Sequence, residues 1–152
     1  FAVSRHRQDD IEEYAVGQAK RTPWPNSAEK VSILVVDDDP LFRKLLTSIL
    51  KKNGFRAVIE LSSGEEAVDY AGNNTVHIVF MDIEMPSEMN GYKTLDALKQ
   101  QQAGLSVIMV SAFSTLENVN IAIEKGAEYF LVKPVEPGKV SNIVDEIHRQ
   151  HC

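Results

Sequence analysis

Five short segments rich in apolar and β-branched residues alternate with longer amphipathic segments from residue 31 onward. We expect strands at residues 31–36, 56–60, 77–81, 105–110 and 128–132. The segments 31–36 and 77–81 are apolar almost throughout, which is typical of strands covered on both faces. Strands that alternate with helices predict a doubly wound, parallel α/β sheet with helices on both of its faces.

Capping signals place the helices between these strands. Asp39-Pro40 predicts the start of the first helix and Asn53-Gly54 its end. The pairs Ser63/Glu66 and Ser114/Glu117 predict capping boxes for the second and fourth helices, a loop containing Pro86 and Gly91 precedes the third, and Pro137 opens the last. The periodicity of the first helix predicts a single buried side made of Leu41, Leu45, Leu46, Ile49 and Leu50.

Residues 1–30 differ from the remainder of the chain. They are polar with a narrow apolar stripe at helical spacing, and two prolines around Trp24 interrupt any helix. We predict a linker or leader segment over 1–30, helical at most in part, followed by one domain over 31–152. The alternative is the tail of a preceding domain or a helix that docks on a partner. Because the first residue is Phe1 rather than Met, we expect the chain to be excised or processed.

Composition and charge narrow the class of protein. The chain is 43% hydrophobic and 25% charged, as expected for a globular domain, and no apolar run approaches the roughly 20 residues of a membrane helix. The net charge of −6 falls entirely on residues 31–152, which argues against nucleic acid as a partner. Cys152 is the only cysteine, which fits a reducing cytoplasmic location.

The predicted central strands deliver polar residues to their carboxyl ends. In a doubly wound sheet this is the edge where ligands bind. Three carboxylates, one hydroxyl and one ammonium are expected there: Asp37, Asp38, Asp82, Ser111 and Lys133. Carboxylates crowded together repel one another unless a cation lies among them, and a cluster of oxygen ligands without His or Cys suits Mg²⁺, with Mn²⁺ as a substitute.

This set of residues is suited to phosphoryl transfer. Asp82 is ionised at neutral pH and can attack phosphorus without a general base. Lys133 and the metal would stabilise the charge on the phosphoryl oxygens, while Ser111 donates a hydrogen bond to one of them. The product would be an acyl phosphate on Asp82.

At these motifs the chain resembles the response-regulator receiver domain of two-component signalling over about 120 residues. The segments that carry the resemblance are Ile33-Leu34-Val35-Val36-Asp37-Asp38, Met81-Asp82-Ile83-Glu84-Met85-Pro86, Val110-Ser111-Ala112 and Val132-Lys133-Pro134. The resemblance implies a flavodoxin-like fold with strand order 2-1-3-4-5. Four motifs in the right order on strand ends are far more specific than any one of them.

The resemblance also implies a role for each matching residue. Asp82 would be the phosphoacceptor and a metal ligand, with Asp37, Asp38 and the backbone carbonyl of Glu84 as further metal contacts. Lys133 would bind phosphate, Ser111 and Phe130 would be the switch residues, and the Lys133-Pro134 bond would be cis. Glu84 and Phe113 would flank the site.

Three departures from the family pattern stand out. The loop from Asp82 to Gly91 is one residue longer than usual, position 111 is Ser where Thr is commoner, and Glu84 and Phe113 occupy positions that vary with the rate of dephosphorylation. We hypothesise that bulky Phe113 obstructs the attacking water and lengthens the lifetime of the phosphoryl group.

The resemblance implies a partner that carries phosphohistidine, either a kinase or a phosphotransfer domain, and a downstream protein target that the sequence does not name. The leader favours the receiver of a hybrid histidine kinase slightly over a stand-alone response regulator. Two further classes compete with a receiver: a Mg²⁺-dependent hydrolase with an aspartyl-phosphate intermediate, which would be an enzyme in its own right, and a pseudo-receiver that only binds protein. His148 and His151 are expected on a solvated helix end rather than in a metal site.

Overall fold

The computed structural model describes residues 23–152. The elements run in the order η1 (Ala28–Lys30), β1 (Ile33–Val36), α2 (Pro40–Lys52), β2 (Val58–Leu61), α3 (Gly64–Asn73), β3 (Ile78–Asp82), α4 (Gly91–Gln101), β4 (Ser106–Ser111), α5 (Leu116–Glu124), β5 (Tyr129–Val132) and α6 (Pro137–His151). The alternation predicted from the sequence is confirmed, with strand bounds shifted by one or two residues.

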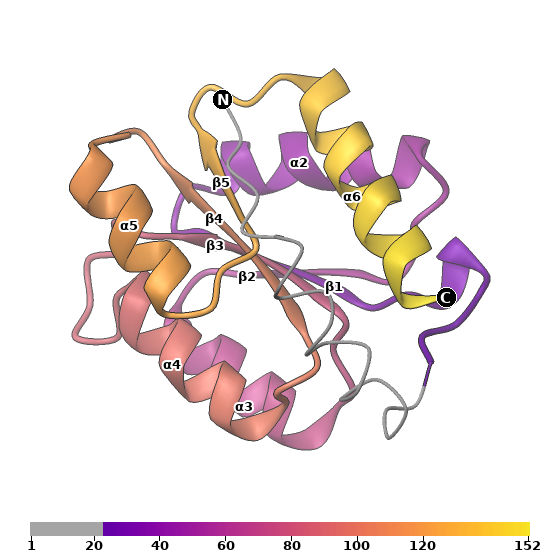
Figure 1. The fold of residues 1–152 in the computed structure, drawn as a ribbon, viewed down its shortest axis with the longest axis horizontal. Coiled ribbons are helices and arrows are strands. Elements are labelled where there is room, and N and C mark those ends of the chain that lie inside the picture. The colour runs from indigo at the N-terminus through magenta and orange to yellow at the C-terminus, as the bar shows by residue number, and fades with distance from the viewer. Residues whose placement is uncertain (1–22) are drawn as a thin grey trace.

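The five strands form one parallel sheet in the order β2-β1-β3-β4-β5, as the resemblance implied. Helices α2 and α6 cover one face and α3, α4 and α5 cover the other (Figure 1). β1, β3 and β4 are buried along their whole length because both of their faces carry helices.

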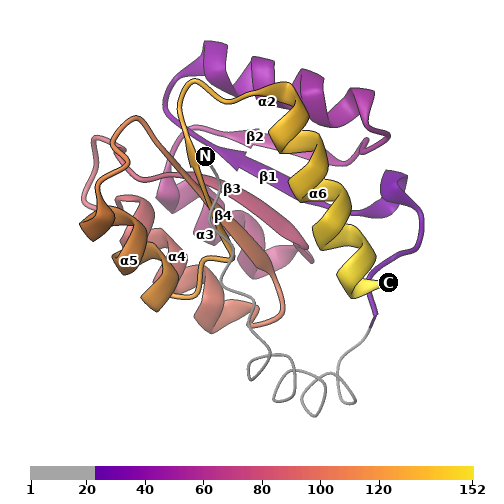
Figure 2. The same cartoon turned by 45° about the horizontal axis from the view of Figure 1, so that its top comes forward.

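Two apolar clusters, one on each face, hold the helices on the sheet. The first unites Leu46, Ile49 and Leu50 of α2 with the buried side of α6, and the second unites α3, α4 and α5 with the opposite side of the strands. Turned forward, the molecule shows α2 and α6 side by side above the sheet (Figure 2). Within the described residues, no helix has the length and apolar character to span a membrane.

The predicted buried side of α2 is too wide. Leu41 and Leu45 are 78% and 49% exposed, whereas Leu46 and Leu50 are fully buried. The sheet covers only part of the apolar stripe of the helix, and the first two leucines face outward beyond it.

The helix caps follow the sequence signals with one correction. Asp39 accepts from the backbone N–H of Leu41, and Ser63 accepts from that of Glu66, as predicted. The prediction of Ser114 as the cap of α5 is wrong, because Thr115 accepts from the N–H of Asn118 and the helix begins at Leu116. Ser114 and Thr115 are both good N-caps, so propensity alone does not separate them.

Candidate functional site

The ends of four strands bring the predicted polar residues to one edge of the sheet. The register pairs Val36 with Met81, and Asp82 with Val110, so the loop after β1 lies beside the end of β3. Ser111 pairs with Val132, which places Lys133 directly after the last paired residue of β5. Residues separated by almost 100 positions in the sequence therefore meet at the carboxyl edge.

Three carboxylates form a tight cluster at this edge. Asp37, Asp38 and Asp82 each offer an oxygen, and these oxygens lie within 4.8 Å of one another. Asp82 and Asp37 are only 3% and 1% exposed, while Asp38 reaches solvent. Oxygen ligands of this kind, partly buried and open on one side, fit Mg²⁺ and leave room for water and phosphate oxygens.

The ionised form of Asp82 is electrostatically unfavourable in this cluster. Burial, together with the neighbouring charge of Asp37, raises the pKa of Asp82 from the ordinary 3.8 to about 7. Lys133 opposes this shift and Glu84 adds to it. A carboxylate whose charge is this unfavourable marks a site that a cation would stabilise.

Lys133 lies across the cluster. Its Nζ is 2.7 Å from Asp37 Oδ2 and 3.6 Å from Asp82 Oδ1, and 4.5 Å above the centre of the Phe42 ring. Burial alone would lower the pKa of Lys133, but its hydrogen bond to Asp37 and the charge of Asp82 outweigh burial and raise that pKa. The ammonium is therefore firmly charged and fixed beside Asp82.

Two residues that no sequence motif indicated, Arg43 and Phe42, hold this arrangement. Arg43 donates from Nη1 to the backbone carbonyl of Asp37 at 2.6 Å, and its Nε lies 3.6 Å from Glu60 on β2. Phe42 lies under the Lys133 ammonium. Both come from the first turn of α2, directly after the acidic motif, and a check of the residues one helical turn beyond that motif would have raised them as candidates.

Ser111 is held by the side chain of Glu84. The hydroxyl lies 2.8 Å from each carboxylate oxygen of Glu84, and it accepts from the backbone N–H of Phe113 at 2.9 Å. Ser111 is fully buried. The sequence pattern indicated only a metal contact through the Glu84 backbone carbonyl and a flanking position for its side chain, and the structure adds the contact with Ser111.

Comparison with known proteins identifies the family to which this site belongs. A sequence model of the response regulator receiver domain matches residues 33–145. The chain belongs to the response regulator receiver family. The chemotaxis protein CheY of Bacillus subtilis is 39% identical to this receiver over 114 residues, covering 75% of this chain and 94% of CheY. The rice two-component response regulator ORR5 is 33% identical over 120 residues, covering 77% of this chain and 88% of ORR5.

Solved structures agree with the sequence relatives. The receiver superposes on a CheY-like receiver domain protein from Methanospirillum hungatei with a TM-score of 0.74 at 26% identity, covering 80% of this chain and 95% of that one. It also superposes on a chain of the CheX-CheY-BeF3-Mg²⁺ complex from Borrelia burgdorferi with a TM-score of 0.73 at 34% identity, covering 78% and 89%. The flavodoxin-like topology of the receiver is thus shared with both.

The remaining predicted residues of the receiver lie on β5 and on the loops that follow β4 and β5. Phe130 is fully buried on β5 in the cluster formed with α3, α4 and α5, whereas Phe113 is 61% exposed on the loop before α5. The Lys133-Pro134 bond is cis, as the resemblance implied. Gly91 lies against the Asp82 backbone, where a Cβ would come within 2.4 Å of the Asp82 carbonyl oxygen, so the loop after β3 needs glycine there.

Proposed function

We propose that this receiver takes a phosphoryl group onto Asp82 from a phosphohistidine-bearing kinase or phosphotransfer domain, and that the acyl phosphate switches its contacts with a downstream protein. One observation carries the proposal. The buried carboxylate of Asp82 lies within 4.8 Å of Asp37 and Asp38 oxygens and 3.6 Å from the Lys133 ammonium, which is what phosphoryl transfer to a carboxylate requires.

The residues present fit a divalent cation. Asp37, Asp38 and Asp82, with the backbone carbonyl of Glu84, would hold Mg²⁺, which would supply positive charge to the phosphoryl oxygens. The raised pKa of Asp82 supports this assignment, because a cation at the cluster would favour the ionised, nucleophilic form.

The chain's own side chains have separable tasks in this reaction. Asp82 Oδ attacks phosphorus, and the bond from phosphorus to the donor histidine nitrogen breaks. Lys133, already 2.7 Å from Asp37, would pair with a phosphoryl oxygen instead. Ser111 would donate to another phosphoryl oxygen, which requires its hydroxyl to leave Glu84.

Phe130 and Ser111 are proposed as the residues that change state with the phosphoryl group. Ser111 is the last residue of β4, and Met109 on the same strand pairs with Phe130 of β5. Movement of Ser111 toward Asp82 would alter the packing of Phe130, which is fully buried here. The family membership supports a cytoplasmic signalling role, and we propose a hybrid histidine kinase as the context, with a stand-alone regulator as the alternative.

A hydrolase with an aspartyl-phosphate intermediate is the competing proposal. Such enzymes use a second acid two residues after the nucleophile, here Glu84. The Glu84 carboxylate instead accepts from the Ser111 hydroxyl, at 2.8 Å from both of its oxygens, which supports a switch rather than acid catalysis by Glu84.

The test is phosphotransfer with Mg²⁺ from a labelled phosphohistidine protein, followed by turnover. We expect one phosphoryl group per chain, loss of transfer when the metal is chelated, and slow turnover. Rapid multiple turnover on small phosphate monoesters would replace the receiver proposal with the hydrolase.

A further inference from the structure

At the amino end of the sheet, opposite the end that carries Asp82, the N-terminal part of the described chain contacts α6. Residues 23–30, here called the arm, lie against the last turn of α6 (Figures 1 and 2). The backbone N–H of Trp24 donates to the carbonyl of His151 at 3.0 Å, and His148 Nε2 donates to the Pro25 carbonyl at 2.8 Å. The arm is therefore fixed to α6 by hydrogen bonds at two successive residues.

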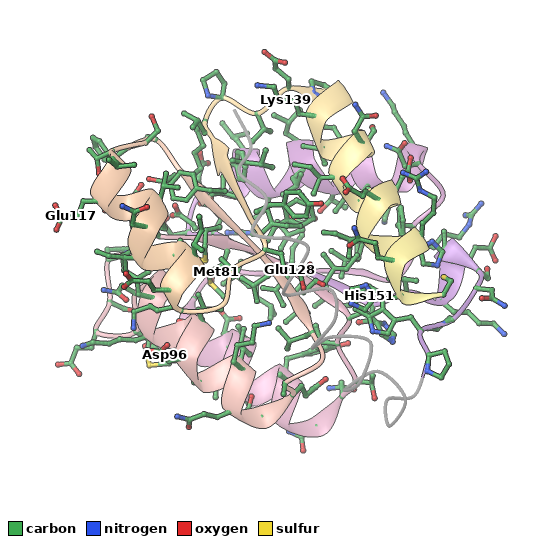
Figure 3. The ribbon with its side chains drawn as sticks, viewed as in Figure 1. Met81, Asp96, Glu117, Glu128, Lys139 and His151 are labelled. Carbon is green, nitrogen blue, oxygen red and sulfur yellow. The ribbon has the colours of Figure 1, made fainter. Side chains whose placement is uncertain are left out.

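The Trp24 ring contacts one residue at the end of α6 and one residue just before β3. It stacks on the ring of His151, which lies at the end of α6 (Figure 3), with centroids 3.9 Å apart and planes 12° from parallel. Its centroid lies 5.3 Å from that of the His77 ring. Trp24 and Ala28 pack on the apolar cluster formed by α2, α6 and the sheet. The surface that receives the arm is thus aromatic and continuous with the core.

His77 ties this surface to β1 and β3. The Ser32 N–H donates to His77 Nδ1 at 2.9 Å, and the backbone N–H of His77 donates to the Ser32 carbonyl at 3.0 Å. Because Nδ1 accepts, the ring is neutral with its proton on Nε2. Burial, followed by the charges of His148 and His151, lowers the pKa of His77, which agrees with this state.

Both elements that hold the Trp24 ring lead to the phosphorylation site at their other ends. β3 begins one residue after His77 and ends at Asp82, while α6 begins four residues after Lys133 and ends at His151. The ring contacts His151 of α6 and His77 just before β3 at once, so a shift of α6 relative to β3 would disturb these contacts. Lys133 now pairs with Asp37, and a phosphoryl group on Asp82 would draw it away.

We propose that the surface formed by His77, His148 and His151 is the docking site of the arm, and that occupation of Asp82 weakens this docking. The arm is then an output element of the receiver, released when the position of α6 relative to β3 changes. The inference rests on the proposed function. Because coupling is reciprocal, loss of the arm contacts must favour occupation of Asp82 by the same factor.

The first experiment uses the fluorescence of Trp24, which is the only tryptophan in the chain. Beryllofluoride with Mg²⁺ serves as the phosphoryl mimic, and its binding is followed independently by fluorine NMR. We expect acrylamide quenching of Trp24 to rise and its emission to shift to the red when the mimic binds. Mg²⁺ alone, and the mimic added to Asp82→Asn, should leave both signals unchanged.

The second experiment measures the reciprocal effect on the full chain. Trp24→Ala should bind beryllofluoride more tightly, on the order of fivefold. Asn26→Ala, an exposed change in the same arm, should bind it as the unchanged chain does. If Trp24→Ala does not fold, His151→Ala takes its place, because it removes the ring stacked on Trp24 and keeps the backbone carbonyl that accepts from the Trp24 N–H.

The outcomes separate the two proposals. Binding of the mimic with unchanged Trp24 quenching, or with equal affinities for Trp24→Ala and Asn26→Ala, overturns the coupled arm and leaves the proposed function standing. Failure of the unchanged chain to bind the mimic overturns both.

Discussion

The two ends of the sheet hold polar groups in opposite electrostatic states. At the carboxyl end, Asp37 and Asp82 are buried like charges with one ammonium between them, and the pKa of Asp82 is raised to about 7. At the amino end, His77 is neutral, hydrogen-bonded to Ser32 and covered by the Trp24 ring. The first end is electrostatically unfavourable as it stands, and the second is satisfied by the chain itself.

The difference shows how to separate a ligand site from a docking contact inside one small domain. Unfavourable charge at a buried site is typical of functional sites, and the proposed cation would offset the negative charge of this cluster. Satisfied hydrogen bonds and aromatic stacking need no further ligand, so the amino end is better suited to hold a segment of the chain. Changes at the carboxyl end should therefore alter chemistry most.

Removal of the central ammonium should have the largest effect. Lys133→Ala should slow phosphorylation of Asp82 by roughly 10²–10³-fold, because a charge aimed at the phosphoryl oxygens is lost. The measurement is the initial rate of label transfer from a phosphohistidine protein. Lys52→Ala, a change of an exposed lysine at the last residue of α2, is the control and should react at the unchanged rate.

Removal of the strained charge should stabilise the metal-free protein. Between about pH 4 and pH 7, the folded state keeps a proton on Asp82 that the unfolded state has already lost. The free energy of unfolding therefore falls as the pH rises through this window. At pH 8, Asp82→Asn should raise the free energy of unfolding by about 2–4 kcal/mol. The measurement is urea denaturation without metal.

The same comparison carries its own controls. Mg²⁺ should close the gap by stabilising the unchanged chain, and the gap should shrink at pH 5, where Asp82 is protonated. The exposed Asp69→Asn should leave stability unchanged. Equal stability of Asp82→Asn and the unchanged chain at pH 8 would show that the cluster is not strained.

Release of the Ser111 hydroxyl from Glu84 should have an intermediate effect on binding of a phosphoryl mimic at Asp82. Glu84→Ala removes the acceptor that holds the Ser111 hydroxyl and a negative charge beside Asp82. Beryllofluoride should then bind about tenfold more tightly, as for the loss of one competing hydrogen bond to a charged group. Glu88→Ala, exposed on the same loop, should not change the affinity measured by fluorine NMR.

The smallest effect is expected at Phe113, on the exposed loop beside the site, where the lifetime of the phosphoryl group is the quantity affected. If Phe113 obstructs the attacking water, Phe113→Ala should shorten the lifetime of the phosphorylated protein by a few-fold, on the order of 1 kcal/mol. The decay of label from purified phosphoprotein measures this, with the exposed Leu116→Ala as the control. An unchanged decay rate defeats the hypothesis.

The strand ends were predictable because period and burial leave strong marks in a sequence. The carboxyl ends of two apolar strands, Ile33–Val36 and Ile78–Asp82, determine which residues reach this edge of the sheet. Parallel pairing of the strands then brings those residues together. The acidic cluster and Lys133 followed from the strand ends alone. The family resemblance added the strand order and the roles.

Other features depend on distances that no local pattern contains. The sequence of α2 does not say how far the sheet covers it, so Leu41 and Leu45 were placed inside. The orientation of Glu84 toward Ser111 and of Arg43 toward the Asp37 carbonyl depends on side-chain torsions and on strands that meet only in three dimensions. The arm contact with α6 joins residues more than 120 positions apart.

The most direct measurement is to locate the phosphoryl group. After transfer from a phosphohistidine protein in the presence of Mg²⁺, the acyl phosphate is trapped by borohydride reduction and the modified peptide is sequenced by mass spectrometry. We expect a single modification, at Asp82, absent from Asp82→Asn and from samples treated with chelator. Modification of another residue, or transfer to Asp82→Asn at the unchanged rate, would contradict it.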